Sequence, residues 1–235
     1  MICGGRGHAH NLHTLSDPSM DQKLLFLINR EWTNPFLDSV MALASNFAAW
    51  VPLLFLIIAL ALWRGGIRAR AFVLTAALIV TFEDVVISNT IKHLVHRPRP
   101  FQALDSVRQV NLARARPRLL GALEPPIIML SEAEGAPGRS GRSFPSSHTV
   151  NTISLALITA CFYRRFGWIS FFPALLVAYS RVYNGSHWPS DVITSLFLGM
   201  GVTLVLLAIL DWLWRANGGR FFREFHARHP SLLTP

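Results

Sequence analysis

Charged residues are scarce in this chain of 235 residues, where they make up only 15% of the sequence against 51% for hydrophobic residues. That balance lies outside the usual range of soluble domains. Cysteine is scarcer still: Cys3 lies in a polar leader and Cys161 in an apolar run, so no bridge between them is expected. The first 18 residues also lack the apolar segment of a signal peptide. The composition therefore predicts a membrane protein rather than a soluble one.

The sequence contains several long apolar runs. A helix needs roughly 20 mostly apolar residues to cross a bilayer, and the sequence offers five candidates. They are Pro35 to Trp63, Ala71 to Ile91, Ser147 to Tyr163, Trp168 to Tyr183 and Asp191 to Trp214. We predict an all-α fold, a polytopic transmembrane helical bundle with five spans, in a single domain. The remainder is expected to form a flexible leader (1–20), a long extramembrane loop (93–145) and a tail (215–235).

The N-terminal region carries two weaker signals. Asp21 to Arg30 mixes apolar with charged positions, which suits either a helix lying in the membrane interface or an ordinary surface helix. His8, His10 and His13 are spaced irregularly, so they are expected in a flexible tail rather than in a metal site. We expect no metal and no other cofactor.

The net charge of +9 indicates anionic partners. The basic residues stand between apolar spans and belong to none of the modules that read grooves or stack bases, so nucleic acid is not expected. Anionic membrane lipids or an anionic substrate fit better. The sequence does not indicate an oligomeric state.

Counting spans alternately divides the connections between two faces of the membrane. Three compact basic stretches share one face: Arg64 to Arg70, Arg164-Arg165 and the tail from Arg215. The long segment Lys92 to Phe144 and the short segment Arg181 to Ser190 share the other. The three compact stretches hold nine Lys or Arg residues and the long segment alone also holds nine, so the positive-inside rule decides the orientation only if substrate-binding residues are discounted.

Acidic residues interrupt the second apolar run. Glu83 and Asp84 lie where charge is costly. Asp84, Ser88 and Lys92 recur every four residues, so on an α-helix they would share the face that points into the bundle. Asp84 as a partner for Lys92 and Asp84 as a catalytic group both remain open.

Three polar motifs stand at the ends of the predicted spans. The first is KHLVHRPRP, in which Lys92 and Arg99 could neutralise a phosphate or could simply anchor a helix end among lipid headgroups. The second is FPSSH, in which Ser146 can cap the helix and the following backbone N–H groups favour an anion. Capping alone does not explain His148, which places an ionisable ring beside the same helix end.

The third motif is SRVYNGSHWPSD, between the last two predicted spans. Arg181 could hold a second phosphate oxygen, and His187 is a potential nucleophile through one ring nitrogen. Asp191 could accept the N–H of the other ring nitrogen and so fix the tautomer. Taken alone, His187 and Asp191 could also be a surface histidine near a helix cap.

The three motifs, in this order and spacing, resemble the signature motifs of the phosphatidic acid phosphatase type 2 superfamily. The resemblance covers the chain from the second span to the start of the fifth. The family most often has glycine between the serine and histidine of the second motif, where this sequence has Ser147. Serine is small and can still present its backbone N–H, so we expect activity to be retained.

The resemblance implies a role for each matching residue. His187 would form a phosphohistidine, Asp191 would orient it, and His148 would protonate the leaving oxygen and later activate water. The phosphoryl oxygens would be bound by Lys92, Arg99, Ser146, Ser147 and Arg181. The resemblance implies a metal-independent phosphatase in the inner or plasma membrane, with its site on the outer face. Its substrate would be a lipid phosphate or pyrophosphate such as phosphatidate, phosphatidylglycerol phosphate, undecaprenyl pyrophosphate or lipid A.

Other functions stay open. A lipid phosphotransferase would share the first half of the reaction, and a non-catalytic lipid-binding or transport protein would not need His187. Relatives that hold vanadate for halide oxidation are mainly soluble, which disfavours that activity here. The segment Phe101 to Phe144 is either a lid that contacts the headgroup or a poorly ordered excursion, since loops of this length are usually one or the other.

Overall fold

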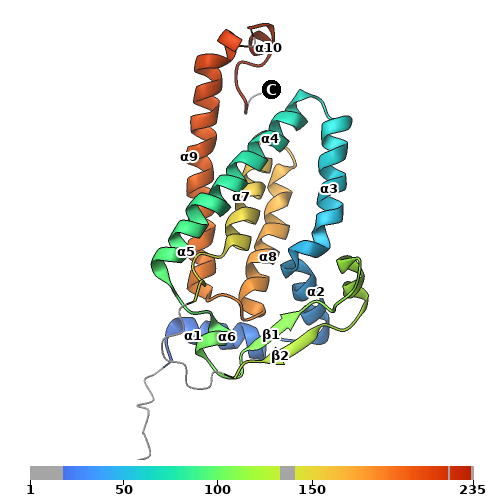
Figure 1. Cartoon of the computed structure of the whole chain (residues 1–235), viewed down its shortest axis with the longest axis vertical. Helices are drawn as coiled ribbons and strands as arrows, with labels where there is room; N and C mark the ends of the chain where they lie inside the picture. The colour runs from blue at the N-terminus through green and yellow to red at the C-terminus, as the bar shows by residue number, and fades with distance from the viewer. Residues whose placement is uncertain (1–17, 133–140, 222, 234–235) are drawn as a thin grey trace, which may run out of the picture.

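The computed structural model describes residues 18–132, 141–221 and 223–233, and helices dominate them. Cys3 and the histidines of the leader lie outside the described residues. The bundle consists of α3 (Phe47–Trp63), α4 (Ile67–Phe82), α7 (Ser147–Phe162), α8 (Phe171–Tyr183) and α9 (Pro189–Phe221). Helix α7 lies in the middle and packs against α4, α8 and α9 (Figure 1).

Two helical stretches are long and apolar enough to cross a membrane, Ile67–Ala103 and Pro189–Arg220. A third qualifies if α2 (Pro35–Ser45) and α3 are counted as one span, although they meet at an angle of 58°. The prediction of one continuous helix from Pro35 was wrong, because the Asn46 side chain accepts the Ala49 N–H at 3.3 Å and starts a new helix. Helices α7 and α8 are shorter, with 16 and 13 residues. The mostly helical fold is confirmed, and the count of five spans is not.

The second span contains a π-helical segment, η2 (Glu83–Ser88), between α4 and α5 (Asn89–Val95). Because a π-helix has a wider turn, the four-residue spacing expected for Asp84, Ser88 and Lys92 does not hold along this stretch. Of the two acidic residues in this segment, Glu83 is fully buried, and its Oε1 accepts the Thr203 hydroxyl of α9 at 2.9 Å. A hydroxyl from a neighbouring helix thus satisfies one oxygen of a carboxylate inside the bundle.

The long segment after the second span is ordered over its described part. It forms α6 (Pro100–Ala103), β1 (Arg108–Asn111), η3 (Arg118–Leu123) and β2 (Ile127–Leu130). The two strands pair antiparallel, with Arg108 opposite Leu130. This hairpin is a departure from the all-α prediction. It gathers with α1 (Met20–Phe26), α2 and α6 at one end of the bundle, away from α10 (Arg223–Arg228) (Figure 1).

A buried asparagine connects this end of the molecule. Asn29, in η1 (Leu27–Glu31), donates from Nδ2 to the carbonyl of Arg108 at 2.8 Å and to that of Tyr183 at 2.6 Å, while its Oδ1 accepts the Arg108 N–H. One side chain therefore joins η1, β1 and the end of α8. Amides that satisfy three backbone groups in a buried position rigidify the elements they join.

Helical structure extends into both chain ends. Ser19 caps α1, so helix begins inside the expected leader. At the other end α9 continues to Phe221, and the expected tail folds back on it. Asp211 accepts the Ser231 hydroxyl and the Leu232 N–H, both at 2.8 Å, which fixes the returning segment.

Candidate active site

A turn after α8 carries His187. The backbone N–H groups of Ser186 and His187 both donate to the carbonyl of Arg181, at 3.0 and 3.1 Å. Gly185 makes the reversal with φ +64°, a conformation that favours glycine. The third sequence motif thus folds back on itself, and it places the histidine directly beside the end of the helix that carries Arg181.

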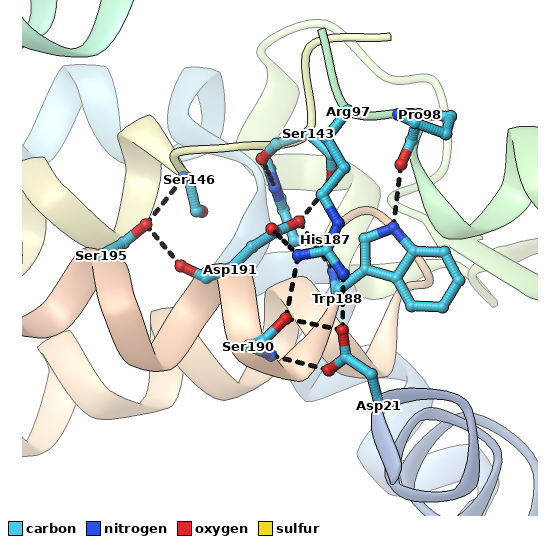
Figure 2. Close-up of polar contacts among 10 residues, drawn as sticks. All are labelled: Asp21, Arg97, Pro98, Ser143, Ser146, His187, Trp188, Ser190, Asp191 and Ser195. Atoms are coloured by element: carbon cyan, nitrogen blue, oxygen red, sulfur yellow. Dashed lines mark hydrogen bonds and ion pairs between the residues drawn. The ribbon is translucent and has the colours of Figure 1, made fainter. Parts of the chain in front are cut away.

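The segment before α7 holds the ring of His187. The carbonyl of Ser143 lies 2.6 Å from Nδ1 (Figure 2). Because a carbonyl only accepts, Nδ1 carries the proton, and the lone pair of the neutral ring is on Nε2. Ser143 is in turn held to the first motif, since its N–H donates to the carbonyl of Arg97 at 2.9 Å. The arrangement leaves Nε2 as the nucleophilic atom.

Asp191 does not make the expected bond to the His187 ring, because Ser143 occupies that position. Its Oδ2 instead accepts the Ser143 hydroxyl at 2.5 Å and the Trp188 N–H at 3.2 Å. Its Oδ1 accepts Nη1 of Arg97 at 2.5 Å (Figure 2). Asp191 is fully buried. The carboxylate therefore acts on the histidine through the two segments that flank it.

Ser146 occupies the predicted N-cap position of α7, but its side chain makes no capping bond. Its hydroxyl accepts that of Thr149 at 3.0 Å, and its N–H donates to Oγ of Ser195 at 2.9 Å. Ser195 also donates to the carbonyl of Asp191 at 2.6 Å. Two serines thus join the start of α7 to the first turns of α9.

Three cations face this region. Lys92 donates to the Ser147 hydroxyl at 2.5 Å, which joins the first motif to the second. The charges of Lys92, Arg99 and Arg181 all act on His148, and those of Arg99 and Arg181 act on His187. Among the described residues none of the three cations is in an ion pair. This combination of cations without carboxylate partners is suited to an anion.

Arg181 has a buried donor group that finds no acceptor among the described residues. Only 9% of the residue is exposed, and Nη1 donates to the Ser45 hydroxyl. Its Nε is buried and has no hydrogen-bond partner within the described part of the chain. A buried charged donor without an acceptor is costly, and a bound anion would remove that cost.

Burial lowers the pKa of His187 well below its usual value, and the positive charges of Arg181 and Arg99 lower it further. The hydrogen bond to Ser143 opposes these effects without cancelling them. His187 is therefore neutral at pH 7 when no anion is bound, which is the form in which Nε2 can attack an electrophile.

The structure brings all eight predicted site residues to one end of the bundle. The charges of Asp84 and Arg142 also reach Lys92, so both lie nearby. Sequence reasoning missed the residues that hold the site together: Asp21, Arg97, Ser143, Ser190 and Ser195. Arg97 and Ser190 stood inside recognised motifs, and residue type alone does not distinguish Arg97 from Arg99.

Comparison with known proteins identifies relatives of this chain. The family model described as the PAP2 superfamily matches residues 68–215. The chain is 29% identical to a lipid A 4'-phosphatase of Bacteroides thetaiotaomicron, over 79% of this chain and 73% of that protein. It is 26% identical to the undecaprenyl-diphosphatase BcrC of Bacillus subtilis, over 77% of this chain and 78% of that protein.

A solved structure shares the fold. The crystal structure of Aquifex aeolicus LpxE superimposes with a TM-score of 0.56 and 22% identity, covering 82% of this chain and 97% of the other. The segment matched by the family model contains all three motifs and more than half of the chain. The chain belongs to the PAP2 superfamily.

Proposed function

We propose that this protein is a metal-independent membrane phosphatase that hydrolyses a lipid phosphate or pyrophosphate through a phosphohistidine at His187. The observation that carries the proposal is the group of three cations without carboxylate partners around two histidines, one of which has a free Nε2. Phosphoryl transfer depends mainly on positioning and charge stabilisation, and such a group supplies both.

The first step transfers the phosphoryl group to the protein. Nε2 of His187 attacks phosphorus, the bond from phosphorus to the lipid oxygen breaks, and its electron pair stays on that oxygen. His148 supplies the proton that the leaving oxygen needs. The negative charge of the bound phosphate favours the protonated imidazolium of His148. Lys92, Arg99 and Arg181 stabilise the charge on the equatorial oxygens.

The second step releases phosphate. His148, now neutral, takes a proton from water as the water oxygen attacks phosphorus. The phosphorus–nitrogen bond breaks and its electrons return to Nε2 of His187, which restores the neutral ring. Asp191 keeps the ring in place through Ser143 in both steps.

The substrate class follows from the setting of the site and from the relatives. The site lies at the end of apolar helices, where a lipid phosphate head would lie while its chains remain in the bilayer. Relatives named as lipid A 4'-phosphatase and undecaprenyl-diphosphatase support both a sugar-linked phosphate monoester and an isoprenyl pyrophosphate. We place the site on the periplasmic or extracellular face.

The test is phosphate release by purified protein in detergent with EDTA present. The panel contains lipid A, undecaprenyl pyrophosphate, phosphatidate and phosphatidylglycerol phosphate. Wild type is expected to release phosphate from at least one of them, and His187→Ala is expected to release none. His93→Ala is the matched control, because it removes an exposed histidine of α5 and should keep full activity.

Two results would contradict the proposal. If His187→Ala releases phosphate at the wild-type rate, no phosphohistidine forms at that residue. If wild type consumes labelled lipid phosphate and the label appears in a second lipid rather than in free phosphate, the protein is a phosphotransferase.

A further inference from the structure

Arg97 lies between two carboxylates. Its Nη1 donates to Oδ1 of Asp191 at 2.5 Å, and its Nη2 donates to Oδ2 of Asp21 at 2.6 Å (Figure 2). Its guanidinium also stands over the ring of Trp188, with Cζ 5.3 Å from the ring centroid. Both arms of this arginine are engaged by protein groups, unlike Lys92, Arg99 and Arg181.

Asp191 depends on this cation. The carboxylate is fully buried, and Arg97 is its partner among the ion pairs of the described residues. A buried carboxylate that loses its counter-charge is strongly destabilised, and its protonated form is then favoured. A protonated Asp191 accepts hydrogen bonds less well from the Ser143 hydroxyl and the Trp188 N–H. Ser143 holds the His187 ring through its carbonyl, and Trp188 follows His187 in the chain.

Helix α1, which begins inside the expected leader, provides the second carboxylate that binds Arg97. Asp21 accepts the N–H of Ser190 at 2.9 Å and its hydroxyl at 2.6 Å, in addition to Arg97. Leu25, four residues on, is fully buried in a cluster that includes Trp188 and Val192. A polar and an apolar contact therefore attach α1 to the start of α9, next to the nucleophile.

We propose that Arg97 is a positioning residue for the phosphatase reaction. It holds Asp191 in the ionised form that fixes Ser143 and Trp188 around His187, and Asp21 of α1 holds Arg97 in turn. The proposal rests on the function proposed above. It makes the N-terminal helix part of the catalytic apparatus rather than only a membrane contact.

The experiment compares Arg97→Gln, Arg97→Lys and Asp21→Asn with wild type, using the lipid that wild type hydrolyses best. Hydrogen bonds to charged groups contribute about 1.5–3 kcal/mol, so Arg97→Gln should lower kcat by about 10- to 100-fold. KM and the inhibition constant of inorganic phosphate should stay close to wild type, because both arms of the Arg97 guanidinium are engaged by carboxylates. Arg97→Lys should recover part of kcat, since an ammonium can still pair with one carboxylate.

Asp21→Asn should have a smaller effect, a loss of kcat of several-fold, because Asp191 retains Arg97. The matched control is Arg215→Gln, which breaks an ion pair of 2.7 Å with Asp211 at the far end of α9 and should leave kcat unchanged. Thermal unfolding in detergent is measured for every variant, so that a change in kcat can be separated from loss of fold.

The outcomes separate the two proposals. If wild type releases no phosphate, the proposed function fails. If wild type is active, a wild-type kcat in Arg97→Gln overturns the positioning role. A rise in KM and in the phosphate inhibition constant instead of a fall in kcat also overturns it. So does an Arg97→Lys variant that recovers none of the lost kcat. If Arg97→Gln does not fold, Arg97→Lys and Asp21→Asn decide the question, and wild-type kcat in both overturns the proposal.

Discussion

At the scale of single residues, the chemistry of the site depends on which nitrogen of His187 carries the proton. The carbonyl of Ser143 fixes the proton on Nδ1 without adding a negative charge to the pair. A carboxylate in the same place would favour the imidazolium, which cannot act as a nucleophile. The more distant Asp191 contacts Ser143, which holds the ring, so it can orient the ring while the ring itself remains neutral.

The protonation of His187 gives the first prediction at this scale. Because burial and two cations lower its pKa well below about 6.5, His187 should remain neutral at pH 6 when no anion is bound. The unfolded chain would take up that proton as the pH falls through about 6.5 and the folded protein would not, so acidification should reduce the free energy of unfolding. The measurement is NMR of ¹⁵N-histidine across pH, with the His187 signals assigned by their absence in His187→Ala. Titration at or above pH 6.5 would contradict the prediction.

The residues that would bind the phosphate in the proposed mechanism could be predicted from the sequence, but the residues that hold them in place could not. Lys92, His148 and Arg181 belong to motifs whose chemistry can be recognised from residue types and order. The acceptor for His187 is a backbone carbonyl, and every residue has one, so no letter in the sequence identifies Ser143. Asp21 lies 76 residues from Arg97 in the chain, and only the packed fold brings them together.

At the scale of elements, the apolar runs predicted where helices form better than where they end. Polar residues within the runs set the actual boundaries: Asn46 ends one helix and starts the next, and the π-helical segment begins at Glu83. The hairpin β1–β2 was not predicted, because its strands have only four residues each and their pairing is a contact between segments far apart.

The turn between α8 and α9 is the element on which His187 depends, and Gly185 is its critical residue. A Cβ at this position would lie 2.4 Å from Cγ1 of Val107 and 2.8 Å from the carbonyl of Arg108, in addition to the strain of φ +64°. Gly185→Ala should therefore destabilise the protein by about 1–3 kcal/mol and lower activity by moving the histidine.

Thermal unfolding and phosphate release test this expectation. The matched control is Gly201→Ala in α9, where a Cβ would meet nothing within 4 Å and alanine favours the helix. Equal melting temperatures for Gly185→Ala and wild type would show that the turn accommodates a side chain, and that its geometry is not what positions His187.

At the scale of the whole molecule, the two ends of the bundle differ in how their basic residues are used. At the end with the hairpin, Arg97 and Arg108 are held in ion pairs, and Lys92, Arg99 and Arg181 gather around the histidines. At the opposite end, exposed arginines stand in or beside the short connections: Arg64, Arg70, Arg164 and Arg165. With the engaged residues discounted, the positive-inside rule leads us to expect these short connections in the cytoplasm and the site outside.

This orientation can be tested with single cysteines in a chain that carries Cys3→Ser and Cys161→Ser. Asn111→Cys places a thiol at the exposed end of β1, and Gly66→Cys places one at the start of α4, where a Cβ meets nothing within 4 Å. A membrane-impermeant maleimide should label Asn111→Cys in intact cells and Gly66→Cys only after the membrane is opened. Phosphate release by each variant confirms that the fold is retained. Labelling of Gly66→Cys alone in intact cells would place the site in the cytoplasm, and a lipid phosphatase there would act on substrates of the inner leaflet.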